Sequence, residues 1–311
     1  MLEQWQLVQR QNLPLEVKIE LSKKKIREWY EHWGGNVDVS FSGGKDSTVL
    51  LHLVRNLYPE VSGLFVDTGL EYPEIKEFVK TQDNIEIYRP KMPFTKVIEK
   101  YGYPIVSKKV ARFVKDLKNP TEKNATTRHT RLTGYTSSGK FCPSLKLPKK
   151  WYYLIDAPFK ISDQCCDVMK KEPFRRYSRE HATYPMTGVM ASESGRRAQQ
   201  YRISGCNAFD GKEPKSSPMA FWTEQDVLRY LRDYNVPYAS VYGDIVEDEN
   251  GKLSTTGAKR TGCMFCMFGV HLEQGENRFQ KMKKTHPKVH EYCMTQLGLK
   301  EVLEYIKVKY E

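Results

Sequence analysis

The sequence predicts an α/β fold with a doubly wound, mostly parallel sheet, a helical N-terminal segment and a cysteine-containing helical C-terminal region. Apolar segments at 37–41, 61–66 and 85–88 are separated by segments with helical spacing, a pattern typical of parallel strands joined by crossover helices. A long helical pattern precedes the first strand, and a C-x-x-C motif lies near the C-terminus. The 311 residues can bury one large core or two smaller ones.

The composition limits the classes of protein to consider. A formal net charge of +12 indicates an anionic partner, such as a nucleotide, a nucleic acid or an acidic protein. No apolar run approaches the roughly 20 residues of a membrane span, and the first residues contain no signal-peptide core. We therefore expect a cytoplasmic protein that does not contact membranes. Its seven cysteines then favour metal or redox chemistry over disulfides.

The patterns along the chain suggest three parts. Residues 1–35 are expected to be helical, because apolar side chains recur there at helical spacing until Gly34 and Gly35. A nucleotide-binding domain is expected at 36–240, with a long basic loop at about 119–150 that has little hydrophobic periodicity. The remaining part, 241–311, contains the C-x-x-C motif and is expected to end in two short helices.

The segment from Val37 to Leu51 predicts a strand, a tight turn and a helix. Gly43 and Gly44 lack Cβ atoms, so backbone amides there can approach an anion closely. The first turn of the helix leaves its amides unpaired, and Lys45 adds a full charge. An ordinary glycine-rich turn is the alternative, and the GxxxxGK[ST] phosphate loop is absent.

The run SGGKDS, Ser42 to Ser47, resembles the pyrophosphate loop of the PP-loop ATP pyrophosphatases, the adenine nucleotide α-hydrolase-like superfamily. The run VDTGLEYPE after the second strand and the run P-M-A-F-W-T-E-Q-D-V resemble segments of the phosphoadenosine and adenosine phosphosulfate reductases. The segment 185–202 is similar to their second nucleotide loop, although Met190 replaces its first arginine.

These resemblances imply a set of site residues. The nucleotide is expected to contact Ser42, Gly43, Gly44, Lys45, Asp46, Ser47, Asp67, Thr68, Gly188, Glu193 and Ser194. The catalytic roles implied are charge neutralisation by Lys45, orientation of the loop or a metal by Asp46, and stabilisation of the α-phosphate by Arg196 or Arg197. Local capping of the next helix is the alternative for Thr68, and a solvated helical face is the alternative for the two arginines.

Four cysteines are candidate metal ligands. A C-x-x-C motif turns two sulfurs toward one ion or cluster, and a second cysteine pair completes the coordination. The adjacent pair Cys165 and Cys166, followed by Cys263 and Cys266, resembles the iron-sulfur type of adenosine phosphosulfate reductase and implies a 4Fe-4S cluster. Zinc, Cys206 as a substitute ligand, or a redox dithiol with basic neighbours such as Arg260 are the alternatives.

The reaction is less determined than the family. The nucleophilic E-C-G-x-H tail of the reductases is absent, and Cys293 lies in a helical pattern. The chain also resembles DndC and SspD, proteins of DNA phosphorothioation. That resemblance implies ATP, Mg²⁺, pyrophosphate release and iron-sulfur-dependent sulfur transfer, with DNA and a cysteine desulfurase or other sulfur donor as partners, in a homodimer or modification complex. The alternatives are a sulfonucleotide reductase that produces sulfite with Cys293 or a partner's thiol, and a non-catalytic nucleotide-binding subunit of a defence complex.

Overall fold

The chain divides into two compact units in the computed structural model, which describes residues 2–311. Unit 1 holds the chain up to Asp67, Glu71–Arg89 and Pro173–Thr261. Unit 2 holds Thr68–Leu70, Pro90–Glu172 and Gly262–Glu311. This division differs from the boundaries expected from the sequence. The chain leaves unit 1 after the third strand and returns at Pro173, so residues 90–172 pack with the C-terminal segment.

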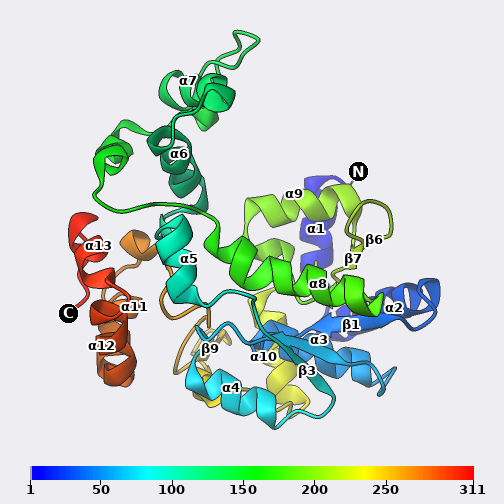
Figure 1. Cartoon of the computed structure of the whole chain (residues 1–311). Coiled ribbons are helices and arrows are strands. Elements are labelled where there is room, and N and C mark those ends of the chain that lie inside the picture. The colour runs from blue at the N-terminus through cyan, green and yellow to red at the C-terminus, as the bar shows by residue number, and fades with distance from the viewer. Residues whose placement is uncertain (1) are drawn as a thin grey trace. The chain divides into compact units, whose positions relative to one another are not determined.

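Unit 1 is built on a six-stranded sheet of order β3-β2-β1-β5-β7-β6 (Figure 1). The strands are β1 (Val37–Ser40), β2 (Gly63–Val66), β3 (Ile85–Tyr88), β5 (Tyr184–Thr187), β6 (Asn207–Ala208) and β7 (Lys215–Ser216). All neighbours are parallel except β6 and β7. The predicted α/β fold with a mostly parallel sheet is therefore confirmed.

The strand order changes direction beside β1. Val39 pairs with Gly63 of β2 on one side and with Met186 of β5 on the other, both in parallel register. The chain therefore continues to one side of β1 first and returns later on the other side. In such sheets the loops at the carboxyl ends of the two strands flank a crevice that binds ligands. The loops after β1 and β5 occupy this place.

Helices cover the sheet of unit 1. They are α1 (Gln4–Gln11), α2 (Leu15–His32), α3 (Lys45–Arg55), α4 (Pro73–Lys80), α8 (Glu172–His181), α9 (Gly195–Ser204) and α10 (Glu224–Asp233), and a hairpin of β8 (Ile245–Glu247) and β9 (Leu253–Thr255) follows. The N-terminal segment forms two helices because Pro14 lacks an N–H and starts α2 as its N-cap. Thr223 caps α10, accepting a hydrogen bond from the Asp226 amide.

Unit 2 is mainly helical. Its elements are α5 (Phe94–Tyr101), β4 (Ile105–Val106), α6 (Lys108–Lys118), α7 (Ala125–Thr133), β10 (Met267–Phe268), α11 (Arg278–Thr285), α12 (Pro287–Thr295) and α13 (Leu299–Tyr305). β4 and β10 form a parallel pair, and the C-terminal segment holds three helices where the sequence predicted two. Across residues 2–311, none of the helices combines the length and apolarity needed to cross a membrane.

The segment 119–150 is not the long loop that its composition predicted. It contains α7, which ends at Gly134 with φ +89°, and a hairpin in which Tyr135 and Phe141 face each other. Hydrogen bonds with capping side chains stabilise this segment, although it lacks hydrophobic periodicity. The Thr121 hydroxyl, for example, accepts a hydrogen bond from the Asn124 amide at the first turn.

Asp38 is an acidic side chain buried inside unit 1. It lies on β1, is completely shielded from solvent, and neither carboxylate oxygen has a hydrogen-bond partner within residues 2–311. Burial raises the pKa of this carboxyl to about 6, and the nearby Thr183 hydroxyl and His181 ring oppose the shift only in part. The ionised form is therefore disfavoured in the folded chain.

The buried Asp38 should make the stability depend on pH. An unfolded-state value of 3.8 and a folded value of about 6 mean that the unfolded chain releases this proton first as the pH rises. The free energy of unfolding should then fall by about 3 kcal/mol between about pH 4 and pH 7. Denaturant unfolding across this range should show a shallower fall for Asp38→Asn. The exposed control Asp210→Asn should keep the wild-type fall, and an unchanged fall in Asp38→Asn would refute this assignment.

Candidate functional site

The loop between β1 and α3 has a geometry that only glycine permits. Gly43 has φ +69°, and a Cβ atom there would lie 2.8 Å from Cγ2 of Ile75. Gly44 is the N-cap of α3, so the loop leads directly into the helix. The positive end of the helix dipole therefore points out of the carboxyl end of β1.

Three hydroxyl groups hold this loop together. Ser47 donates to the Gly44 carbonyl at 2.9 Å and accepts from the Ser42 amide at 3.1 Å. The two serine hydroxyls lie 3.0 Å apart, and Thr48 also donates to Gly44, at 3.0 Å. Ser42 and Ser47, predicted as ligand contacts, therefore first serve to fix the loop.

Two backbone amides of the loop are held only by long hydrogen bonds. The Gly44 amide donates to the Ser42 hydroxyl at 3.3 Å, and the Lys45 amide donates to the Tyr242 hydroxyl at 3.4 Å. Both distances exceed the usual range for N–H···O bonds. Because both acceptors are neutral hydroxyls, an anionic oxygen would be a stronger acceptor for either amide. The loop thus offers two donors at a helix N-terminus to a phosphate or sulfate group.

Lys45 places a charge against this loop from within the protein. Its side chain is only 6% exposed, and Nζ lies 3.2 Å from Oε1 of Glu224 and 5.1 Å from the ring centre of Tyr242. The Tyr242 hydroxyl also lies 2.5 Å from that of Thr261. Sequence reasoning did not place Glu224, Tyr242 or Thr261 at this site. The only local signal was the position of Glu224 in the first turn of a capped helix.

Asp46 is next to Lys45 and is partly withdrawn from solvent. Burial, followed by the charge of Glu193, raises the pKa of the Asp46 carboxyl to about 6, while Lys45 and Arg260 act in the opposite direction. A carboxyl with this pKa exchanges a proton near neutral pH. Acids with a perturbed pKa beside a loop with weakly held donors are typical of functional sites.

The arginines near Glu193 have different roles. Arg197 forms an ion pair with Glu193, and Arg260 lies 3.8 Å from the same carboxylate. Ser194 caps α9 by accepting a hydrogen bond from the Arg197 amide at 3.3 Å. Arg196 is exposed and makes no ion pair with any side chain of residues 2–311, so of the two predicted arginines it is the one with an available charge. Arg260, expected beside the cysteines, instead faces Glu193.

Gly188 brings the loop after β5 against the loop after β1. A Cβ atom at this position would lie 3.0 Å from the carbonyl carbon and oxygen of Asp46 and 3.2 Å from the Ser47 amide nitrogen. Such distances to backbone atoms are tighter than nearly all real Cβ contacts, so a side chain here would push the backbone of the neighbouring loop away by a few tenths of an ångström. The prediction that Gly188 belongs to this site is therefore consistent with a packing role, in which it lets two backbones touch.

The two predicted residues after β2 are separated by the division of the chain. Asp67, in unit 1, forms ion pairs with Lys76 at 2.6 Å and Arg89 at 3.5 Å. Thr68 belongs to unit 2, where its hydroxyl accepts a hydrogen bond from the Leu70 amide at 3.2 Å. The local turn considered for Thr68 is thus present, and contact with a nucleotide stays a prediction for both residues.

The four predicted cysteine ligands all lie in unit 2 and interact electrostatically. Burial raises the pKa of the Cys165 thiol well above its usual range, and Cys166, Cys263 and Cys266 raise it further. Cys263 and Cys266 are joined by a tight turn in which the Cys266 amide donates to the Cys263 carbonyl at 3.1 Å.

Burial raises the pKa of the partly buried Cys266 thiol, and two cations, Lys170 and Arg278, act in the opposite direction. No group of three or more His, Cys, Asp or Glu side chains within residues 2–311 is arranged around the position of a single metal ion. A four-iron cluster has a separate iron for each thiolate and needs a wider cage than one ion. The cluster ligands therefore stay a prediction.

The other cysteines have different surroundings. Cys206 is buried in the core of unit 1 beside Tyr201, and burial raises the pKa of its thiol to about 12. Cys293 is completely buried on α12 in unit 2, and burial likewise raises its pKa to about 12. Both thiols stay neutral at physiological pH, so neither is suited to act as a nucleophile. Cys142 is only partly buried.

Comparisons with known proteins show which family this chain resembles. The family model described as "Phosphoadenosine phosphosulfate reductase domain" matches residues 36–134 and 142–267. A phosphoadenosine 5'-phosphosulfate reductase of Xanthomonas euvesicatoria is 27% identical over 67% of this chain and 66% of its own length. An uncharacterised protein of Methanocaldococcus jannaschii is 27% identical over 86% of this chain and 42% of its own. The chain thus spans less than two thirds of both relatives.

A solved structure also resembles this chain. The crystal structure of phosphoadenylyl-sulfate reductase from Candida auris in its phosphate complex has a TM-score of 0.41 and 16% sequence identity, covering 81% of this chain and 98% of that chain. The family match includes both loops described above and the four predicted cysteine ligands. This chain therefore belongs to the phosphoadenosine phosphosulfate reductase domain family.

Proposed function

We propose that this chain is an enzyme that binds an adenine sulfonucleotide, with its phosphate and sulfate groups on the Ser42–Ser47 loop, and releases sulfite. The observation that carries the proposal is the pair of weakly held amides of Gly44 and Lys45 at the start of α3, beside the buried Lys45 ammonium. Family membership and the reductase relative support an adenine sulfonucleotide as the ligand.

The residues of the loop would stabilise the nucleotide that leaves. When a thiolate attacks the sulfate sulfur, the S–O bond to the phosphate breaks and negative charge grows on the phosphate oxygen. The amides of Gly44 and Lys45 and the Lys45 ammonium would neutralise that charge. Arg196, the exposed arginine at the start of α9, would add a bidentate contact to the phosphate.

The electrons must come from two thiols. The first thiolate attacks the sulfate sulfur, forms an S-sulfonate and releases the nucleotide. The second thiol then attacks the sulfur of the first thiol in this S-sulfonate, so a disulfide forms and sulfite leaves. Cys293 is buried and its thiol is neutral, so it does not supply either thiol. We assign both thiols to an external dithiol reductant. This assignment corrects the expectation that Cys293 acts as the nucleophile.

Product analysis tests the proposal. Purified protein with a dithiol reductant and either adenosine phosphosulfate or phosphoadenosine phosphosulfate should release sulfite and the desulfated nucleotide in equal amounts. Omitting the reductant should stop sulfite release. Tight binding of the sulfonucleotide with no sulfite under either condition would contradict the proposal and leave a nucleotide-binding subunit as the function.

A second candidate is cleavage of ATP between its α and β phosphates during sulfur transfer to a nucleic acid. The basic segment 119–150 favours it, because seven of its residues are Lys or Arg and one is acidic. In this case Asp46 would hold Mg²⁺, which supplies charge neutralisation to the departing pyrophosphate. Pyrophosphate release from ATP without sulfite release from a sulfonucleotide would select this function.

Cys165, Cys166, Cys263 and Cys266 are proposed to hold a 4Fe-4S cluster. The neighbouring cysteines raise the pKa of Cys165, because thiolates close together repel each other, and binding to iron would offset this repulsion. Anaerobically purified protein should contain about four iron and four sulfide per chain. Cys166→Ser or Cys263→Ser should lose most of both, whereas the control Cys142→Ser should retain them. Zinc without sulfide in the wild-type protein would contradict the cluster.

A further inference from the structure

A hairpin in unit 2 exposes two aromatic side chains on one face. Tyr135 and Phe141 are opposite each other in an antiparallel bridge, and their ring centres lie 5.1 Å apart. They are 48% and 52% exposed. The Thr136 amide donates to the Lys140 carbonyl at 3.0 Å and closes the turn between them. About half of each ring is therefore exposed to water, in a preformed aromatic pair that lies outside the hydrophobic core.

This hairpin is a feature of this chain beyond the family pattern. The family match ends at residue 134 and resumes at 142, so residues 135–141 lie outside it. Within unit 2, the hairpin follows α7 at the outer end of an arm formed by α6 and α7 (Figure 1). We call residues 108–147 the α6–α7 arm. Its aromatic pair is thus absent from the shared nucleotide-binding framework.

Positive charge surrounds the aromatic pair in the sequence. The segment 119–150 carries a formal charge of +6, half of the net charge of the chain. Six of its cations make no ion pair with any acidic side chain of residues 2–311: Lys123, Arg128, Lys140, Lys146, Lys149 and Lys150. Unpaired cations on one short segment attract a polyanion.

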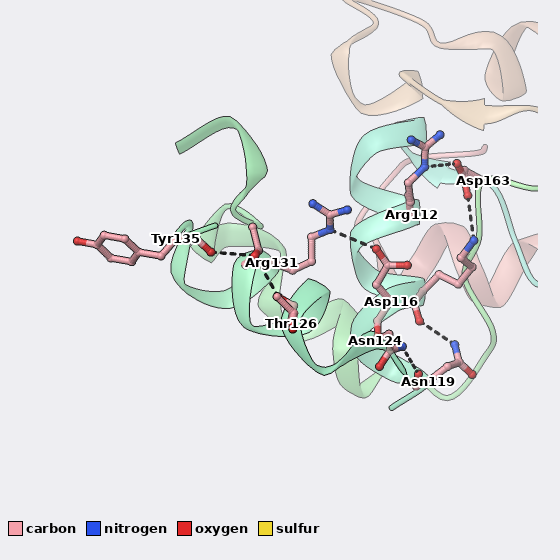
Figure 2. A network of polar contacts seen from close by, with 10 residues as sticks. Arg112, Asp116, Asn119, Asn124, Thr126, Arg131, Tyr135 and Asp163 are labelled. Atoms are coloured by element: carbon pink, nitrogen blue, oxygen red, sulfur yellow. Dashed lines mark hydrogen bonds and ion pairs between the residues drawn. The ribbon is translucent and has the colours of Figure 1, made fainter. Parts of the chain in front are cut away.

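The seventh cation holds the arm in place. Arg131 donates from Nε to Asp116 at 3.2 Å (Figure 2). Its guanidinium group also stacks on the Phe113 ring, 4.0 Å from the ring centre. The Thr130 hydroxyl lies 2.8 Å from the Tyr135 carbonyl, which ties the hairpin to α7. In Figure 2 the Tyr135 ring points away from this network. These contacts hold the aromatic pair in place, so its side chains lose little conformational entropy when a ligand binds.

We propose that the α6–α7 arm binds single-stranded nucleic acid, with bases stacked on Tyr135 and Phe141 and backbone phosphates beside the unpaired cations. Aromatic platforms within positive surfaces are how proteins hold unpaired strands. A duplex keeps its base faces stacked inside and cannot offer them to the rings. An acidic polypeptide such as polyglutamate would satisfy the cations but has no aromatic ring to stack on the pair. The inference does not depend on the proposed reaction.

Fluorescence anisotropy with labelled oligonucleotides of about 20 nucleotides tests this proposal. Oligo-dT and oligo-U should both bind more tightly than a duplex of equal length, and affinity should fall steeply with salt. Tyr135→Ala should weaken binding of the single strands about tenfold, while Tyr135→Trp should keep it. Lys140→Ala should reduce the salt dependence by about one phosphate contact.

Matched controls keep the test specific. Trp5→Ala removes an aromatic ring that is 64% exposed in unit 1, and Lys24→Ala removes an exposed lysine of α2; both should bind as the wild type does. Circular dichroism should show that Tyr135→Ala is folded. The proposal is overturned if the duplex binds better, if polyglutamate competes equally with the single strands, or if folded Tyr135→Ala keeps its affinity. Because no adenine nucleotide is present, these outcomes are independent of the reaction.

Discussion

Lys45→Ala is expected to lower kcat/KM for the nucleotide substrate by at least about 100-fold, whichever product the enzyme releases. The Lys45 side chain is buried at the start of α3. Among residues 2–311 its ammonium group forms an ion pair with Glu224. Its removal would take away the buried charge that is proposed to balance the departing phosphate. Steady-state kinetics on the purified variant measure the effect.

The loss should come from the site and not from unfolding. Glu224 is more than half exposed, so leaving it without Lys45 should change the free energy of unfolding by about 1 kcal/mol or less. The control Lys24→Ala, in an exposed part of α2, should retain full kcat/KM and stability. Full activity of a folded Lys45→Ala protein would remove the lysine from the mechanism.

Gly188→Ala should weaken adenine nucleotide binding by at least about tenfold. The added methyl group would lie 3.0 Å from the carbonyl of Asp46, and backbone atoms cannot rotate out of its way. The loop after β1 must then shift, which displaces the amides that receive the phosphate. Overpacking of this kind should also cost about 1 to 3 kcal/mol of stability.

A second glycine of the same segment provides the control. Gly195 is the first residue of α9, and a Cβ atom there would have no neighbour within 4 Å. Gly195→Ala should therefore bind nucleotide with wild-type affinity. Isothermal titration with the same nucleotide compares the two variants. Equal affinity of Gly188→Ala and the wild type would show that contact between the two loops does not shape the site.

Local patterns were enough to predict the framework of unit 1. The alternation from Val37 to Phe41, the two glycines and the apolar helix after Lys45 fix β1, its loop and α3 from short-range physics. Such features need no information about distant residues, and they were predicted correctly.

The remaining features depend on contacts between distant segments. Tyr242 and Arg260 reach the site from the end of unit 1, about 200 residues beyond the loop in the chain, and no local pattern marks them. Cys206 seemed equivalent to the other cysteines until its packing beside Tyr201 was known. Composition alone could not distinguish a basic loop from the α6–α7 arm, because capping bonds and a hairpin order it without apolar periodicity.

The most direct test of the central claim is a crystal structure of the chain with an adenine nucleotide. The account predicts phosphate oxygens within about 2.7 to 3.2 Å of the Gly44 and Lys45 amides, with the Tyr242 hydroxyl displaced from the latter. A nucleotide bound elsewhere, while both amides keep their bonds to Ser42 and Tyr242, would contradict it.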